Sequence, residues 1–414
     1  MPKPVLNTIK EVLDREHLVG GYEAQEYFAD KLSRVYESLG RLIGCDDPIA
    51  EIALVDSATT AWSRAFYSIP LEEHDVILVS KVEYAANMVA ILQQCKRKNA
   101  QVMYIPSDKM GCVSLPALQN MLENTPRVRA VCITWIPTNG GVVNDAEGIG
   151  QICACYPDIF YLLDACQAVG HVCVDVQALR CSMLTGTGRK YLRGPRGTGF
   201  LYVSCEVLKR LDEPITLDHF AAPWVELDRY AILPTAKRFE QWEKNVSGLI
   251  GLGCAVDYLL DESVVGMEWA QQRIRFLGRK LREALTALGR EYVVPSSTEG
   301  DDSEARGGRE EEDGAPPPLS PWLTVWDMGT DSLSSSRGGI VTFTMSYANA
   351  DVVKKVLKDR NIYVSVSSPT STLIDATERS LPTVVRASLH YFNTELEIFI
   401  LCDTLREIYL EICS

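Results

Sequence analysis

The sequence LTGTGRKYLRGPRGTGFLYV, residues 184–203, carries the strongest signal in this chain. An apolar run ends in small and hydroxylated residues, Lys190 follows among three arginines, and a glycine-rich turn leads into a second apolar run. Glycines permit tight turns and close backbone approach. Neighbouring positive charges favour the neutral form of a lysine amine, which Schiff-base chemistry requires. Lys190 is therefore a candidate catalytic residue, and a solvated basic turn is the alternative.

Short apolar runs alternate with longer amphipathic stretches on both sides of this segment, from about residue 20 to 260. Such alternation is typical of a mostly parallel β-sheet covered by helices on both faces. The sequence therefore predicts an α/β fold with strands at residues 51–55, 75–80, 101–106, 130–136, 160–165, 182–188 and 199–203. Because such sheets bind ligands at the carboxyl ends of their strands, we expect the chemistry there.

The pattern changes after about residue 260. The stretch WAQQRIRFLGRKLREALTALGRE (269–291) has apolar residues at three- and four-residue spacing, which predicts a long surface helix. A smaller α+β domain is predicted from a strand, a helix, a strand and a final helix at 337–345, 349–361, 362–367 and 394–412. We thus expect a large domain at 21–260 and a small domain formed by 1–20 and 261–414.

One segment of the small domain, residues 295–321, is rich in acidic residues, proline and glycine and has no aromatic residue. Such a segment buries too little apolar surface to offset the entropy of ordering it. We expect a disordered surface insertion, with a regulatory segment as the alternative.

Composition limits the classes of partner. The formal net charge is −14 and the pI is about 5.0, which argues against nucleic acid and anionic membranes. No apolar run approaches the roughly 20 residues of a membrane span, and the polar start is unlike a signal peptide. Thirteen scattered cysteines, with one close pair at Cys153 and Cys155, indicate reduced thiols in a cytoplasmic protein without a metal site.

Two further motifs follow predicted strands. In FYLLDACQAVGH (160–171), Asp164 ends an apolar run and Gln167 follows it; the acid either faces a ligand or caps a helix. In EIALVDSATTAWSRAFYSI (51–69), small hydroxylated residues begin an amphipathic helix. Such a start is either an anion site built from free backbone N–H groups or an ordinary helix cap.

Together the three motifs resemble, in order and spacing, the fold type I pyridoxal-phosphate (PLP) enzymes, specifically the class V aminotransferase and cysteine desulfurase superfamily. The resemblance extends from about Gly20 to the C-terminus. It includes EYAAN (83–87), PTNGG (137–141), RFEQWE (238–243) and VVRASLHYFNTELEI (384–398). It implies a PLP-binding large domain with a mostly parallel seven-stranded sheet and a small α+β C-terminal domain.

The resemblance also implies roles for individual residues. Lys190 would hold PLP as a Schiff base, Asp164 would pair with the pyridine nitrogen, and Gln167 would bind the phenolic oxygen of the ring. Ala58 and Thr59 would contact the phosphate.

Further cofactor contacts are implied for Thr187 and Arg189, which would face the phosphate, and for Tyr84, which would stack on the ring. Arg189 and Tyr84 both stand where desulfurases carry histidine. Asn139 and Arg386 would hold the substrate carboxylate, a task that suits the two-pronged guanidinium.

Relatives in this superfamily are dimers in which the neighbouring subunit completes the phosphate site. The resemblance therefore implies a homodimer. The Gly-Thr that relatives carry after Arg-Phe-Glu is replaced here, and the contact across the dimer would move to Ser247 or Asn245.

The reaction is narrowed by a missing cysteine. Desulfurases keep a nucleophilic cysteine before the C-terminal arginine, but residues 364–385 contain none. The chain looks most like C–S lyases that cleave hercynylcysteine sulfoxide and like isopenicillin N epimerase-like proteins. We expect an amino-acid substrate and β-elimination from a cysteine derivative, with transamination, epimerisation or a non-catalytic role as alternatives. A dinucleotide cofactor is disfavoured because no G-x-G-x-x-G follows the first strands.

Overall fold

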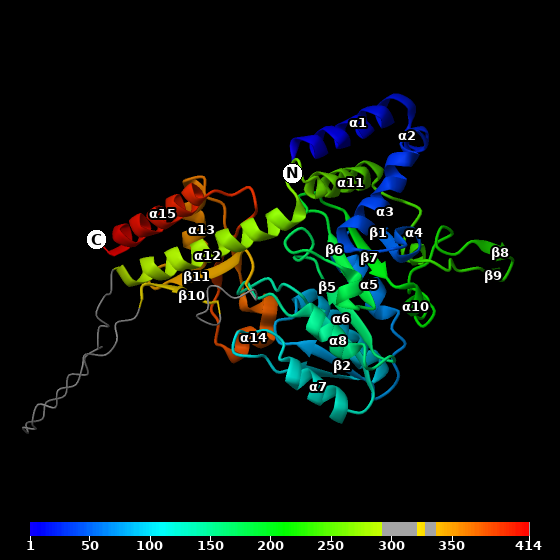
Figure 1. Cartoon of the computed structure of the whole chain (residues 1–414), viewed down its shortest axis with the longest axis horizontal. Coiled ribbons are helices and arrows are strands. Elements are labelled where there is room, and N and C mark those ends of the chain that lie inside the picture. Colours follow the sequence, from blue (N-terminus) through cyan, green and yellow to red (C-terminus); the bar gives the residue numbers. More distant parts are fainter. Residues whose placement is uncertain (292–320, 328–336, 414) are drawn as a thin grey trace, which may run out of the picture.

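The computed structural model describes residues 1–291, 321–327 and 337–413 (Figure 1). The predicted strands form one seven-stranded sheet of order β1-β7-β6-β5-β4-β2-β3. Of the seven strands, only β7 runs antiparallel to the other six. The strands are β1 (Ile52–Val55), β2 (Val76–Ser80), β3 (Gln101–Ile105), β4 (Val128–Thr134), β5 (Phe160–Asp164), β6 (Met183–Thr187) and β7 (Gly199–Val203). The prediction of a mostly parallel α/β sheet is confirmed.

The central strands are largely apolar because helices cover both faces of the sheet. Leu78, Val131 and Leu163 point to one face, while Ile77, Ala130 and Leu162 point to the other. The first face is covered by α3 (Ala29–Ile43), α7 (Leu115–Asn124), α8 (Ala146–Cys153) and α11 (Val246–Leu260). The second is covered by α5 (Ala58–Tyr67) and α6 (Ala85–Lys98).

The small-domain sheet is antiparallel, in the order β10-β11-β13-β12. Its strands are β10 (Leu323–Val325), β11 (Ile340–Met345), β12 (Ser365–Ser367) and β13 (Val384–Ser388). Its helices are α12 (Met267–Glu291), α13 (Ala350–Asp359), α14 (Leu373–Glu378) and α15 (Glu395–Cys413), with a 3-10 turn at Pro369–Thr372. The predicted helices and strands of this domain are present, but β10, α14 and β13 were not predicted. Apart from Pro321, the predicted insertion at 295–321 lies outside the described residues.

The helix α12 joins the two parts of the molecule. Ile274 packs in the core of the large sheet, whereas Leu281 packs in the core of the small one. Figure 1 shows α12 running from beside α11 to the small-domain sheet.

The N-terminal helix α1 (Lys3–Val19) lies away from the small-domain sheet. It packs along α11, where Val12 meets Val246 and Ile250. Residues 1–20, which we expected to join the small domain, are therefore placed against the large one, and the domain boundaries stay a prediction.

The remaining elements are short connections around the large sheet. They are α2 (Gly21–Tyr27), α4 (Pro48–Glu51), α9 (Val176–Leu179), α10 (Cys205–Leu208), a 3-10 turn at Ala236–Phe239, and a hairpin of β8 (Trp224–Glu226) and β9 (Arg229–Tyr230).

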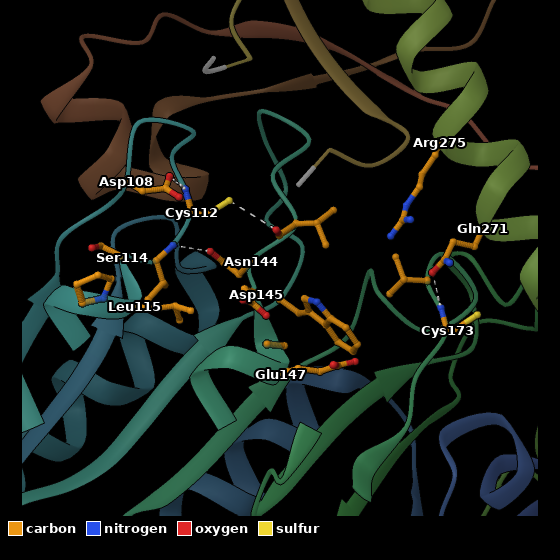
Figure 2. Close-up of a pocket in the computed structure, with 16 residues that line it drawn as sticks. Asp108, Cys112, Ser114, Leu115, Asn144, Asp145, Glu147, Cys173, Gln271 and Arg275 are labelled. Carbon is orange, nitrogen blue, oxygen red and sulfur yellow. Dashed lines mark hydrogen bonds between the residues drawn. The ribbon is translucent and has the colours of Figure 1, made fainter. Parts of the chain in front are cut away.

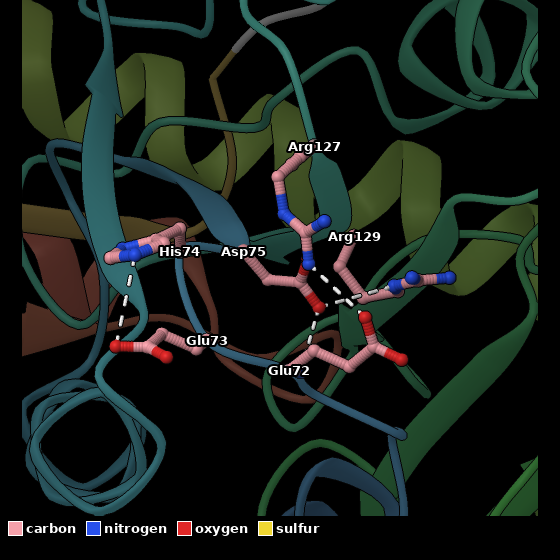
Figure 3. Close-up of polar contacts among 6 residues, drawn as sticks. All are labelled: Glu72, Glu73, His74, Asp75, Arg127 and Arg129. Carbon is pink, nitrogen blue, oxygen red and sulfur yellow. Dashed lines mark hydrogen bonds and ion pairs between the residues drawn. The ribbon is translucent and has the colours of Figure 1, made fainter.

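An ion-pair cluster secures the amino ends of β2 and β4 (Figure 3). The buried carboxylate of Asp75 accepts hydrogen bonds from Arg127 (2.9 Å), Arg129 (3.4 Å) and the backbone N–H of Glu72 (2.8 Å). The opposite, carboxyl ends of the same two strands carry the polar side chains of the candidate site.

Candidate active site

Asp164, the last residue of β5, lies at the carboxyl edge of the sheet. Its buried carboxylate accepts hydrogen bonds from the backbone N–H of Cys166 to Oδ1 (2.9 Å) and from the side-chain amide of Asn87 to Oδ2 (2.8 Å). The chain then turns, and the next helix begins only at Val176. The alternative that Asp164 caps a helix is therefore wrong.

Lys190 lies in the turn after β6 and is half-buried. Burial raises the pKa of the neighbouring Cys166 thiol to about 11, the negative charge of Asp164 adds to this rise, and the hydrogen-bonding Lys190 amine opposes it. Cys166 thus interacts with both Lys190 and Asp164, and the roles of these two residues toward a cofactor stay predictions.

The N-terminus of α5 lies against β7 on the other side of this turn. Ser57 caps the helix by accepting a hydrogen bond from the backbone N–H of Thr60 (3.1 Å). The N–H groups of Ala58 and Thr59 precede the first intrahelical bonds and can face an anion. The close approach requires Gly199, because a Cβ there would lie 2.7 Å from the carbonyl carbon of Ser57.

Thr187 and Arg189 occupy the end of β6 and the turn beyond it. Thr187 pairs with Gly199 across β6 and β7, and Gly199 pairs with Val55 at the end of β1. The buried Thr187 hydroxyl donates to the carbonyl of Thr198 (3.2 Å), whereas Arg189 is exposed to solvent. Only one strand, β7, therefore separates Thr187 from the start of α5.

Arg386 reaches the large domain from β13. Its guanidinium donates to the hydroxyl of Thr138 (2.6 Å), to Oε1 of Gln167 (3.2 Å) and to Ser388 (3.0 Å). Burial lowers the pKa of Arg386. No carboxylate within the described ranges forms an ion pair with it, so its partners are neutral. A buried guanidinium whose partners are all neutral can bind a carboxylate.

Gln167 and Asn139 flank Arg386. The Gln167 amide nitrogen donates to the carbonyls of Ile136 (3.1 Å) and Pro137 (2.8 Å), so both its N–H groups are used. A hydrogen bond from this amide to the cofactor ring, as predicted, requires one of them to be released. The Asn139 amide donates to Thr372 (3.1 Å), and its buried oxygen has no partner among the described residues.

A comparison with known families identifies the family of this chain. The family model described as Aminotransferase class-V matches residues 1–304. The chain belongs to this family. A probable cysteine desulfurase from Methanothermobacter thermautotrophicus is 27% identical over 412 residues, covering 98% of this chain and 92% of the relative.

Solved structures agree with the family at the level of the fold. A cysteine desulfurase from Thermococcus onnurineus NA1 superposes with a TM-score of 0.81 at 19% identity, covering 99% of this chain and 92% of that structure. The cystine C–S lyase C-DES superposes with a TM-score of 0.78 at 19% identity, covering 98% and 94%. This class V enzyme therefore has the fold type I architecture of PLP enzymes, as predicted.

PLP is the cofactor of this class V enzyme, and the residues at the site fit it. A half-buried amine on Lys190, a buried carboxylate on Asp164 and the free N–H groups at the start of α5 match its aldehyde, ring nitrogen and phosphate. The polar groups are thus of the right kind at each position.

Two residues at this site were not predicted from the sequence. Asn87 binds Asp164, and the buried Glu83 accepts hydrogen bonds from Thr134. Both lie in EYAAN, directly after β2. The rule that ligands bind at strand carboxyl ends could have identified them. Tyr84, between them, is 41% exposed, and its backbone N–H donates to Thr134 (3.3 Å).

Ser247 was predicted to contact the phosphate group of a neighbouring subunit. It is in the first turn of α11 and its hydroxyl donates to Asn245 (3.1 Å). Within the described part of the chain no interaction joins it to Lys190 or Asp164. Its role in a neighbouring subunit's phosphate site stays a prediction.

A pocket with a volume of about 800 Å³ contains none of the predicted site residues (Figure 2). Loops at the sheet edge form one wall, and Gln271 and Arg275 of α12 face them. Within the described ranges no cluster of histidine, cysteine or acidic residues could hold a metal ion. In the same ranges no helix is both long and apolar enough to cross a membrane.

Proposed function

We propose that this PLP enzyme catalyses β-elimination from a cysteine-derived amino acid, as a C–S lyase does. The supporting observation is the segment before Arg386, where desulfurases carry their nucleophilic cysteine. In this chain residues 364–385 have no cysteine, and between β12 and β13 they form a 3-10 turn followed by α14.

This segment is also tied to the large domain. Asn139 donates to the buried Thr372 (3.1 Å), the backbone N–H of Asp375 donates to the carbonyl of Lys81 (3.2 Å), and the Lys81 amine pairs with Glu378 (2.7 Å). A cysteine that transfers sulfur needs to lie on a mobile loop, but these three contacts hold the segment against the large domain.

Cys166 is a poor substitute for the missing nucleophile. It sits beside Lys190, but burial raises its pKa to about 11. At neutral pH it is therefore a thiol rather than the reactive thiolate. Its backbone N–H is bound to Asp164 (2.9 Å), which fixes it in the turn after β5.

The remaining residues suit elimination. When bound, PLP withdraws electrons from the α-carbon of an amino acid. Lys190 would take the proton from that carbon, Asp164 would provide the negative charge opposite the ring nitrogen, and Arg386 would hold the carboxylate. Asn139, whose buried oxygen has no partner among the described residues, would accept a hydrogen bond from the substrate.

In the net reaction, a cysteine S-conjugate and water give a thiol, pyruvate and ammonium. Transamination and epimerisation begin with removal of the same proton. The names of the relatives favour a second candidate, cysteine desulfurase, whose products would be alanine and a persulfide.

The products distinguish these reactions. Purified enzyme would be incubated with cysteine, cystine, cysteine S-conjugates and a cysteine sulfoxide, with the Lys190→Ala variant as control. Pyruvate and ammonia should appear in equal amounts with the sulfur product, and alanine should be absent. Alanine with sulfane sulfur, a keto acid retaining its sulfur, or the D-amino acid would each refute elimination.

We also propose a homodimer located in the cytoplasm. The support for the dimer is the resemblance to dimeric relatives, in which the neighbouring subunit completes the phosphate site. Light scattering on the purified protein tests the dimer, and a monomer that binds PLP normally would contradict it.

A further inference from the structure

Glu83 is a buried acid without a cation. It is 2% exposed, and no lysine or arginine within the described ranges forms an ion pair with it. Three donors hold its carboxyl group: the hydroxyl of Ser80 (2.6 Å) and the backbone N–H (2.6 Å) and hydroxyl (2.6 Å) of Thr134. Burying a carboxyl group costs free energy unless its oxygens are hydrogen-bonded. The three donors around Glu83 offset this cost.

These bonds join the carboxyl ends of two strands. Ser80 is the last residue of β2 and Glu83 comes three residues later, whereas Thr134 is the last residue of β4. The strands pair directly, and their register ends at Val79 and Cys132. The side-chain hydrogen bonds of Glu83 therefore join the ends of β2 and β4 beyond their last paired residues, at the edge of the sheet where the candidate site lies.

Two residues that come soon after Glu83 in the chain, Tyr84 and Asn87, lie at the candidate cofactor site. Tyr84, next in the chain, donates its backbone N–H to the hydroxyl of Thr134 (3.3 Å) and begins α6. Asn87, in the first turn of α6, donates to Asp164 (2.8 Å). Asp164 in turn pairs with Thr134 across β4 and β5. The contacts form a closed ring from Glu83 through Thr134 and Asp164 back to α6.

We propose that Glu83 is a positioning residue for the cofactor site. By clamping Thr134 to the start of α6, it holds Asn87 against Asp164 and sets the direction of Tyr84. The inference rests on the roles proposed for Asp164 and Tyr84 and not on which reaction follows. It assigns Glu83 no contact with substrate or cofactor.

Two variants break the clamp in different ways. Glu83→Ala removes the acceptor of all three bonds. Thr134→Val keeps the branched shape and removes only the hydroxyl that joins Glu83 to the N–H of Tyr84. Glu51→Ala is the matched control, because Glu51 is also buried and accepts a bond from a backbone N–H, that of Cys205 (2.7 Å), but precedes β1 at the opposite edge.

The readout is PLP binding by the apoenzyme. Fluorescence titration gives the dissociation constant, and circular dichroism of the bound cofactor in the visible range reports its orientation. Glu83→Ala and Thr134→Val should each weaken binding about 10-fold and alter the dichroism. Glu51→Ala should lower the melting temperature but leave both measurements unchanged.

A double variant tests the route. Because Glu83 affects Asp164 through Asn87, the losses of PLP affinity in Glu83→Ala and Asn87→Ala should combine in the double variant to less than their product. Unchanged affinity and dichroism in Thr134→Val, or effects that multiply in the double variant, would overturn the proposal. If Glu83→Ala does not fold, Thr134→Val decides alone. A product assay that refutes β-elimination leaves these measurements valid, so the two failures can be told apart.

Discussion

The Arg386→Lys variant tests how the substrate is held. The guanidinium reaches Thr138 with one nitrogen (2.6 Å) and Gln167 with another (3.2 Å), and it retains donors for a carboxylate. A lysine ammonium at the same place keeps the charge but is a single point. It cannot hold Thr138 and Gln167 while also meeting both oxygens of a carboxylate.

The expected loss can be estimated from these contacts. A hydrogen bond to a charged group contributes about 1.5 to 3 kcal/mol, and each 1.4 kcal/mol corresponds to about tenfold. Losing one of two prongs therefore costs about 10- to 100-fold, and the misalignment of the α-proton extends this toward about 1000-fold. The loss should appear in kcat/KM, with PLP affinity and spectrum unaltered.

Steady-state kinetics with several cysteine S-conjugates measure this loss. Arg273→Lys is a matched control, since Arg273 is a half-buried arginine that bonds the backbone carbonyl of Asn393 (3.2 Å) outside the site. Wild-type kcat/KM in Arg386→Lys on every substrate would refute the reasoning, because the carboxylate would then be held elsewhere.

Three further predictions concern charge and stability. Asp164→Asn should keep the fold and bind PLP but lose about 100-fold or more in kcat/KM, because the amide presents a donor to Asn87 and no charge to the ring; near wild-type turnover would contradict this. Burial raises the pKa of Glu83 to about 7, above its unfolded value, so its stabilising contribution is complete below about pH 4.5 and lost as pH rises to about 7. In urea unfolding of the apoenzyme, the free energy of unfolding of Glu83→Gln should therefore rise relative to that of the wild type by about 2 to 3 kcal/mol between about pH 5 and 8. A difference that does not change with pH would contradict this. Asp75→Ala should lower the free energy of unfolding by about 1 to 2 kcal/mol, a modest loss because its partner Arg127 is half-exposed, with kcat/KM unchanged; a fall in kcat/KM would show that the two sheet edges are coupled.

The central strands of the large sheet were predictable because they are buried on both faces. Such strands are short, continuous apolar runs, and FYLLD and GFLYV are typical examples. In β13, by contrast, the apolar run is interrupted by Arg386, which points toward the site. A polar functional residue within a strand thus interrupts the apolar run by which the strand would be predicted.

The position of α1 shows a second limit. Its amphipathic pattern indicates that Val5 and Val12 are buried, but periodicity does not say against what. The chain places this helix on α11, next to residues more than 200 positions away in sequence (Thr8 donates to Cys254). Only the folded arrangement supplies that partner.

At the candidate site, the sequence indicated Asp164 and Lys190 but not Glu83 and Asn87. Asp164 and Lys190 follow apolar strands directly, so strand ends locate them. Glu83 and Asn87 act through Thr134 and Asp164, and those contacts join three strands whose order is not evident from spacing. The amide orientation of Gln167 depends on two carbonyls of a loop and was likewise beyond the sequence.

The most direct test of the account is the identity of the lysine that carries the cofactor. The PLP-loaded enzyme would be reduced with borohydride, digested and examined by peptide mass spectrometry, with Lys190→Ala treated in parallel. The account predicts a pyridoxyl group on Lys190, in the turn beside Cys166, and none in the variant. A pyridoxyl group on any other lysine of the wild-type protein would contradict it.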